Sequence, residues 1–168
     1  MNKLADILFY FLVFLLQVII TDYLHLGPFL FICLIPFLIL NIPQSRQPQL
    51  VLVIAFGMGI MLDLLSDGVI GLNAAAAVAA AATRKPFYRL LVNRDRQDQT
   101  EWSAPATIGI PKYLKYAAAV TAVYLAVYVA FECISFRPAG FILLKFALST
   151  VVDTALALLL GLSLRNRR

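Results

Sequence analysis

The stretch from Gly57 to Asn73, GMGIMLDLLSDGVIGLN, is the most informative part of this chain because it predicts a tight reversal between two apolar segments. Asp67 and Gly68 form a turn signal near its centre, and Gly71 opens the segment that follows. The stretch also carries a second carboxylate, Asp63, inside an otherwise apolar run. An acid in that position is costly near a bilayer and therefore requires a structural or functional reason.

Helical spacing predicts that this stretch forms a closely packed hairpin. Gly59, Asp63 and Asp67 are spaced by four residues and share one helix face. Small residues on such a face allow a second helix to approach closely in a membrane. The residues predicted to pack the hairpin or to dock a partner are Gly57, Gly59, Asp63, Asp67, Gly71, Asn73 and Ala77. A simpler interpretation stays open, in which Asp63 and Asp67 only cap helix ends.

Composition indicates an all-α integral membrane protein with a single domain over residues 1–168. The chain is 62% hydrophobic and has a mean hydropathy of +0.87, whereas soluble domains have roughly 45–50% apolar residues. No signal-peptidase-like site follows the first apolar segment before His25, which predicts a retained helix. Cys33 and Cys133 lie in apolar stretches and predict neither a disulfide nor a metal site.

Apolar runs predict a bundle of six transmembrane helices. The expected spans cover residues 4–22, 28–42, 50–66, 69–83, 113–134 and 141–164, and residues 84–112 form a cytoplasmic loop. The second and fourth spans are short against the ~20 residues that cross a bilayer, so one of them could be re-entrant. The first half of the loop has helical spacing and could lie on the membrane surface. The loop serves either as a docking surface for a cytoplasmic partner or as a basic linker that fixes orientation.

The basic residues predict the orientation of the bundle. Of the 14 Lys and Arg residues, only Arg137 and Lys145 fall on the side opposite to the amino terminus, the second and fourth loops and the tail. By the positive-inside rule both termini lie in the cytoplasm, which requires an even number of spans. The net charge of +5 also favours contact with anionic membrane lipid. Nucleic-acid binding is not expected, because these charges flank helices and form no patch interleaved with aromatic residues.

Four ionisable residues, Glu132, Arg137, Lys145 and Asp153, are predicted to form a polar seam inside the bundle. Lys145 and Asp153 belong to a polar stripe with a spacing of four on the last helix. The helical rise places Asp153 about 18 Å from the start of that helix, near mid-membrane. A charge there costs about 2.5–3.5 kcal/mol unless it is paired or faces protein. Lys145 is the expected counter-ion for Asp63 or Glu132.

Catalysis is not expected from this pattern of residues. The single histidine, His25, sits in a short outer loop, and no serine has the context of a nucleophile elbow. The sequence has no metal-binding H-E-x-x-H helix and no phosphate-cradling glycine loop. An intramembrane aspartyl protease would need two facing acids at one depth, whereas Asp63 and Asp153 are expected at different depths. The sequence therefore predicts a non-enzymatic protein without a cofactor or a metal.

The run from Gly57 to Ala74 resembles the signature of the rod shape-determining protein MreD family. In that signature a glycine-bearing helix and an aspartate precede a short glycine turn and the motif G-L-x-A. The residues that carry the resemblance are Gly59, Asp63, Gly71, Leu72 and Ala74. The motif covers a small part of the chain, while the layout of apolar segments agrees over nearly all of it. Leu72 joins the predicted packing or docking residues because of this resemblance.

The resemblance implies a scaffold of the bacterial cell-elongation (rod) complex in the inner membrane. MreD-like proteins bind the membrane-anchored protein MreC. They help couple cytoplasmic MreB filaments to peptidoglycan synthesis by RodA and its class B penicillin-binding partner, and so maintain cell shape. Their helical fold is similar to that of the substrate-binding subunits of energy-coupling-factor transporters.

A vitamin-binding subunit of an energy-coupling-factor transporter is the competing expectation. Such a subunit encloses a ligand near the outer face, where this sequence also gathers polar residues. The predicted outer loops are brief, however, and supply little material for a lid over a ligand. Stripes of glycine and alanine instead favour a scaffold that grips the single transmembrane helix of a partner.

Overall fold

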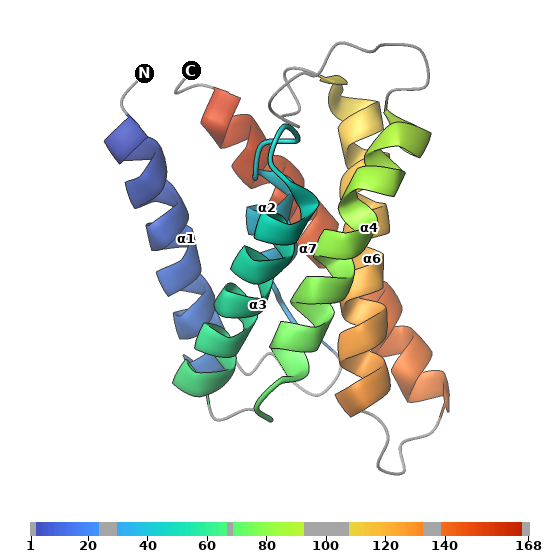
Figure 1. The fold of residues 1–168 in the computed structure, drawn as a ribbon. Coiled ribbons are helices and arrows are strands. Elements are labelled where there is room, and N and C mark those ends of the chain that lie inside the picture. The colour runs from blue at the N-terminus through green and yellow to red at the C-terminus, as the bar shows by residue number, and fades with distance from the viewer. Residues whose placement is uncertain (1–2, 24–29, 67–68, 93–107, 133–138, 166–168) are drawn as a thin grey trace.

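The computed structural model describes residues 3–23, 30–66, 69–92, 108–132 and 139–165, and in these residues the fold is all-helical. Six helices follow one another along the described chain: α1 (Lys3–Tyr23), α2 (Ile35–Leu40), α3 (Pro48–Leu65), α4 (Leu72–Leu91), α6 (Ile110–Glu132) and α7 (Ala139–Arg165). Successive helices run in alternating directions (Figure 1). The beginning of α1 and the end of α7 therefore lie at the same end of the bundle.

Helix α4 lies in the middle of a row of long helices. It packs against α3 on one side and against α6 on the other, and α6 in turn packs against α7. Much of α4 is alanine, and the small alanine side chain lets both neighbours approach closely. The buried alanines of this helix are Ala74, Ala76, Ala77, Ala80 and Ala81. The alanine-rich sequence of α4 thus explains why this helix can pack closely against both α3 and α6.

The short helix α2 lies inside the bundle. Its six residues are all buried, and it contacts α1, α3, α4 and α6. Pro36 lies in the first turn of α2, where a backbone N–H would have no acceptor within the helix, so the lack of an N–H in proline costs no hydrogen bond. Proline at this position favours the start of a helix. Residues 30–34, here called the lead-in segment, are not helical. The predicted span over residues 28–42 therefore differs from the structure, which has a short buried helix behind a non-helical lead-in.

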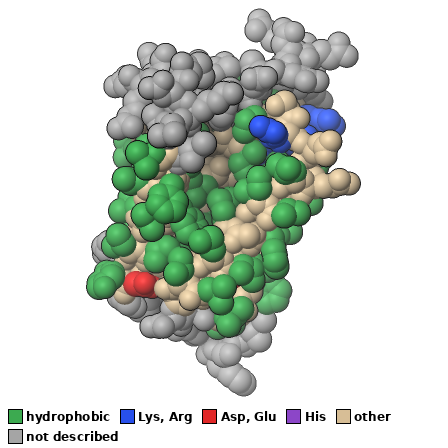
Figure 2. All heavy atoms as spheres, turned by 60° about the vertical axis from the view of Figure 1, so that its left-hand side comes forward, with side chains coloured by type: hydrophobic (Ala, Val, Ile, Leu, Met, Phe, Trp, Pro, Cys, Tyr) green, Lys and Arg blue, Asp and Glu red, His purple; other side chains and the backbone are tan. Residues whose placement is uncertain are grey.

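Three helices within the described residues are long and apolar enough to cross a membrane, as judged by length and composition. They are Pro48–Leu65, Ile110–Glu132 and Gly140–Ser163. Large apolar side chains cover the outside of the bundle, and Val53 and Val151 are 71% and 69% exposed. Figure 2 shows the apolar surface that results. A surface of this kind is suited to lipid rather than to water, which supports the assignment as a membrane protein.

Helix α4 extends beyond the predicted span of residues 69–83 and takes in the first part of the predicted loop over residues 84–112. Residues 84–91 continue α4 and do not form a separate helix at the surface. The extension buries Tyr88, whose ring meets that of Tyr116 on α6 edge-on, with 5.5 Å between the ring centroids. This packing supplies the reason for the longer helix. Residues 93–107 of the loop lie outside the described residues, and α6 begins at Ile110.

Candidate functional site

The two helices of the hairpin approach each other most closely at Gly59 of α3. A Cβ atom at this position would meet Cα of Ala74 and would lie 2.8 Å from the backbone oxygen of Asn73, both on α4. These are backbone atoms, which cannot move aside as the end of a flexible side chain can. Glycine at position 59 therefore sets the distance between α3 and α4. Gly57, by contrast, is exposed and has no atom within 4 Å of the place that its Cβ would take.

The Asp63 carboxylate, one turn further along α3, caps the first turn of α4. Its Oδ1 accepts the N–H of Asn73 at 3.1 Å, and its Oδ2 accepts those of Gly71 at 2.9 Å and Ala74 at 3.2 Å. Such amides lack partners within their own helix. The helix dipole further favours a carboxylate at this end. Asp63 is only 2% exposed, so these bonds replace the water that the carboxylate has lost.

Asn73 connects this cap to a third helix. Its Nδ2 donates to Asp63 Oδ1 at 2.9 Å, and its Oδ1 accepts a hydrogen bond from the Tyr124 hydroxyl of α6 at 2.6 Å. All three side chains are buried. Asp63, Asn73 and Tyr124, here called the cap network, therefore join α3, α4 and α6.

Gly71 allows the chain to enter α4 in the orientation that the cap requires. It has a φ of +96°, in the left-handed region that side chains with a Cβ rarely adopt. Directly after it, the first amides of α4 point towards Asp63. A glycine is therefore needed at position 71 for a conformational reason, whereas position 59 needs one for a packing reason.

The structure distinguishes between the two interpretations of Asp63. Its side chain caps a helix, but this is the following helix of the hairpin and not α3 itself. The expected pairing of Lys145 with Asp63 or Glu132 is found with Glu132. Of the remaining predicted packing residues, Ala77 is buried and Leu72 is half-buried. Asp67 lies outside the described residues.

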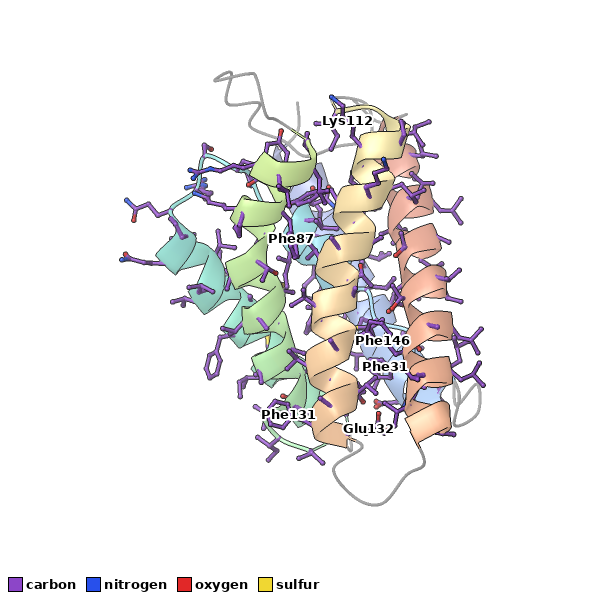
Figure 3. All side chains as sticks on the ribbon, turned by 90° about the vertical axis from the view of Figure 1, so that its right-hand side faces the viewer. Phe31, Phe87, Lys112, Phe131, Glu132 and Phe146 are labelled. Carbon is purple, nitrogen blue, oxygen red and sulfur yellow. The ribbon has the colours of Figure 1, made fainter. Side chains whose placement is uncertain are left out.

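Among the members of the polar seam that the structure describes, Lys145 on α7 forms an ion pair with Glu132 at the end of α6. Lys145 Nζ lies 2.7 Å from Oε1 and 2.6 Å from Oε2 of Glu132. The side chain of Lys145 is 7% exposed and that of Glu132 is 30% exposed, so the carboxylate reaches the surface and the ammonium does not. Figure 3 shows Glu132 and Phe31 at the end of α6 that lies opposite Lys112. Arg137, the fourth predicted member of the seam, lies outside the described residues.

Further along the same face of α7, two side chains bind the backbone of the lead-in segment. Ser149 Oγ accepts the N–H of Phe31 at 3.0 Å, and Asp153 Oδ1 accepts the N–H of Cys33 at 3.0 Å. Non-helical backbone inside an apolar bundle must find its hydrogen bonds within the protein. The buried acid at position 153 therefore has a structural role. Within the described residues, its second oxygen, Oδ2, has no hydrogen-bond partner.

Gln17 of α1 binds the lead-in segment from the other side. Its Oε1 accepts the N–H of Leu34 at 2.6 Å, and its Nε2 donates to the backbone oxygen of Ile32 at 3.2 Å. The same Nε2 lies 2.9 Å from Thr21 Oγ1. Gln17 is fully buried, and it fixes α1 to this non-helical segment.

Arg84 of α4 holds the far end of α2. Its Nη1 donates to the backbone oxygen of Ile39 at 2.8 Å, and its Nη2 donates to that of Pro43 at 3.0 Å and to Gln44 Oε1 at 3.3 Å. The last carbonyls of a helix lack donors within that helix, and a cation there complements the helix dipole. The guanidinium group therefore serves as the C-terminal cap of α2.

Sequence reasoning missed two of these interior residues. Arg84 was counted among the charges of the cytoplasmic loop, although it continues the buried face of α4 from Ala77 and Ala81 at helical spacing. Gln17 lies in the first predicted span, over residues 4–22, and no role was predicted for it. In both cases a polar residue lies among apolar residues of the same helix, and this pattern was the signal in the sequence for a buried polar contact.

The polar groups of the interior are used mainly to hold the chain's own backbone. The cap network closes the hairpin, while Gln17, Ser149, Asp153 and Arg84 fix the lead-in segment and α2 between α1, α4 and α7. The described residues contain no group of three or more His, Cys, Asp or Glu that could hold a metal ion. Chemically, this arrangement makes the helices rigid with respect to one another.

Comparison with known proteins yields no match to a protein family, to a curated protein or to a solved structure. The fold therefore defines the class of the protein, which is an all-helical protein with three described helices capable of spanning a membrane.

Proposed function

We propose that this protein is a non-enzymatic scaffold of the rod complex in the bacterial inner membrane, similar to MreD. The observation that carries the proposal is that the residues of the MreD-like motif act together in one hairpin. Gly59 permits the close approach of the two helices, Asp63 caps the second helix, and Gly71 permits the turn before it. A rigid hairpin of this kind is what a scaffold requires of its docking element.

In this proposal the six helical segments form one membrane bundle, similar in fold to the substrate-binding subunits of energy-coupling-factor transporters. The lead-in segment and α2 together form a re-entrant second segment. Both termini face the cytoplasm, because the basic residues belong to the end of the bundle where α1 begins and α7 ends. Among the residues whose side chains the structure describes, these cations are Arg46, Arg84, Lys85, Arg89, Lys112 and Lys115.

The outer face of α3 is the proposed docking surface for a partner helix. Gly57 is exposed there, and Val53 and Met61, one turn to either side, are 71% and 53% exposed. A glycine between two larger apolar residues leaves a shallow depression into which a single transmembrane helix can pack. An MreC-like membrane-anchored protein supplies such a helix. MreB, RodA and the class B penicillin-binding protein join this assembly directly or through that partner.

Co-expression with an MreC-like protein from the same organism tests the docking surface. After purification in mild detergent, native mass spectrometry should detect a complex of the two proteins. Gly57→Leu should abolish the complex, because the new side chain fills the depression without touching the rest of the bundle. Ala147→Leu, which adds the same bulk to an exposed position on α7, should leave the complex intact. Equal recovery from both variants would contradict the docking surface.

The alternative function is that of a vitamin-binding subunit of an energy-coupling-factor transporter. The observation in its favour is that the shielded ammonium group of Lys145 lies beside Phe31, 6.0 Å from the ring centroid, at the end proposed to face outwards. A vitamin-sized ligand retained in native mass spectra, and lost in Lys145→Met, would support this function. Depletion of the protein from rod-shaped cells separates the two functions, since only loss of the scaffold should make the cells round.

A further inference from the structure

One end of the bundle carries cations that the hairpin and the interior contacts do not use. Arg46, Arg89, Lys112 and Lys115 are exposed, and Lys85 is half-buried. Figure 2 shows Lys and Arg side chains gathered at the upper rim of the molecule, above an apolar surface. Four acids have side chains that the structure describes: Asp22, Asp63 and Glu132 belong to the opposite ends of α1, α3 and α6, and Asp153 is buried inside the bundle. None of these four acids lies beside the cations of this rim.

Three of these cations form a defined group. Lys85 Nζ donates to the backbone oxygen of Arg46 at 2.9 Å, which holds the chain before α3 against α4. Arg89 lies one turn beyond Lys85 on the same face of α4. Arg46, Lys85 and Arg89 are here called the basic rim.

The surface that continues from the basic rim is apolar. Leu50 at the start of α3 is 47% exposed, Val53 one turn later is 71% exposed, and Leu90 next to Arg89 is 67% exposed. Cations beside exposed apolar side chains match the two parts of a phospholipid, an anionic headgroup and its acyl chains. A free phosphate ion would use only the cations and would leave the apolar side chains uncovered.

We propose that the basic rim binds the headgroup phosphate of an anionic phospholipid in the membrane leaflet that faces this end of the bundle. The acyl chains of that lipid lie along Leu50 and Val53. Each Lys or Arg near an anionic surface strengthens such binding roughly fivefold. The cations of the basic rim belong neither to the cap network nor to the proposed docking surface, although Val53 is shared between that surface and the lipid site. Headgroup binding can therefore be tested by substitutions that leave the docking surface unchanged.

The test compares two double variants that remove the same amount of charge. The full chain is reconstituted in nanodiscs of phosphatidylcholine with a minority of phosphatidylglycerol, and the lipids retained by the protein are counted by native mass spectrometry. The wild type should retain phosphatidylglycerol preferentially. Arg46→Gln with Arg89→Gln should lower this preference roughly tenfold or more, whereas Lys112→Gln with Lys115→Gln should cause a much smaller loss. Both variants keep the bond from Lys85 to the Arg46 backbone.

Three results would overturn the proposal. A wild type without preference for phosphatidylglycerol would show that the basic rim does not bind this lipid. An equal loss in the two double variants would show diffuse attraction to an anionic surface instead of a site. Displacement of phosphatidylglycerol by excess inorganic phosphate would show a site for a free anion instead of one for a lipid.

Discussion

Asp63 Oδ1 accepts two hydrogen bonds from Asn73, one from its backbone N–H at 3.1 Å and one from its Nδ2 at 2.9 Å. The acid lies near the end of α3 and the amide in the first turn of α4, so the hairpin is closed by polar contacts as well as by packing. Because the donors follow Asp63 in the chain by 8 to 11 residues, the cap can form only when the two helices lie side by side.

Removal of the Asp63 carboxylate should destabilise the protein strongly. Asp63→Leu leaves the amides of Gly71, Asn73 and Ala74 without an acceptor, and each buried, unsatisfied group costs about 1–3 kcal/mol. Asp63→Asn keeps one acceptor oxygen and should have an intermediate effect. Unfolding in mixed micelles with increasing dodecyl sulfate measures these free energies. Asp22→Leu, at an exposed position of α1, is the control, and an Asp63→Leu variant as stable as that control would refute the capping role.

The two glycines of α3 should respond oppositely to the same substitution. Gly59→Ala places a Cβ against the backbone of α4 and should lower the free energy of unfolding by about 1–3 kcal/mol, as overpacking does. Gly57→Ala meets open space and should be neutral or stabilising by up to about 1 kcal/mol, because alanine favours helix more than glycine. Thermal unfolding in one detergent provides the comparison. If both variants behave alike, position 59 does not set the helix spacing.

Asp153 should tolerate an amide better than an apolar side chain. Asp153→Asn retains an oxygen for the N–H of Cys33, whereas Asp153→Leu removes this acceptor and should cost about 1–3 kcal/mol. The asparagine variant should stay close to the wild type, because Oδ2 has no hydrogen-bond partner to lose within the described residues. Hydrogen exchange at the Cys33 amide reports on the same contact, and should accelerate in Asp153→Leu alone. Identical unfolding of the two variants would argue against this contact.

Arg84 and Arg89 should differ sharply although they lie on the same helix. Arg84→Leu deprives the backbone oxygens of Ile39 and Pro43 of their donor and should cost about 1–3 kcal/mol. Arg89→Leu changes an exposed side chain and should stay within about 0.5 kcal/mol of the wild type. Chemical labelling of a cysteine introduced at Ile39 measures whether α2 leaves the interior. Similar labelling in both variants would show that Arg84 does not hold α2.

The hairpin could be predicted to a large extent because its signals are local. A glycine with an aspartate four residues later, followed by a turn and a further glycine, places Gly59 and Asp63 on one face and Gly71 at the reversal. The hydrogen-bond partner of Asp63 could not be predicted with the same precision. A buried acid requires a partner, and either a salt bridge with Lys145 or hydrogen bonds from the amides of a helix end would supply one. The periodicity of the helices does not show which of these two partners lies beside Asp63.

The second segment shows where prediction from hydropathy fails. Apolar composition over residues 28–42 is compatible with a spanning helix, yet the lead-in segment is non-helical and α2 is short. The amides of the lead-in segment find their acceptors on residues distant in the chain, among them Gln17 and Asp153. Composition within a window cannot report such acceptors, since they lie 17 and 120 residues away from the amides they bind.

Composition and spacing within one helix were enough to predict the all-helical, membrane-type character, the reversal between α3 and α4, and the polar stripe on α7. The cap that Asp63 forms on α4, the choice of Glu132 as the partner of Lys145, and the contact of Arg84 with α2 follow only from the folded arrangement. A buried polar group must find a partner wherever packing brings one within hydrogen-bond distance. That distance depends on how the helices pack against one another, which spacing within a single helix does not specify.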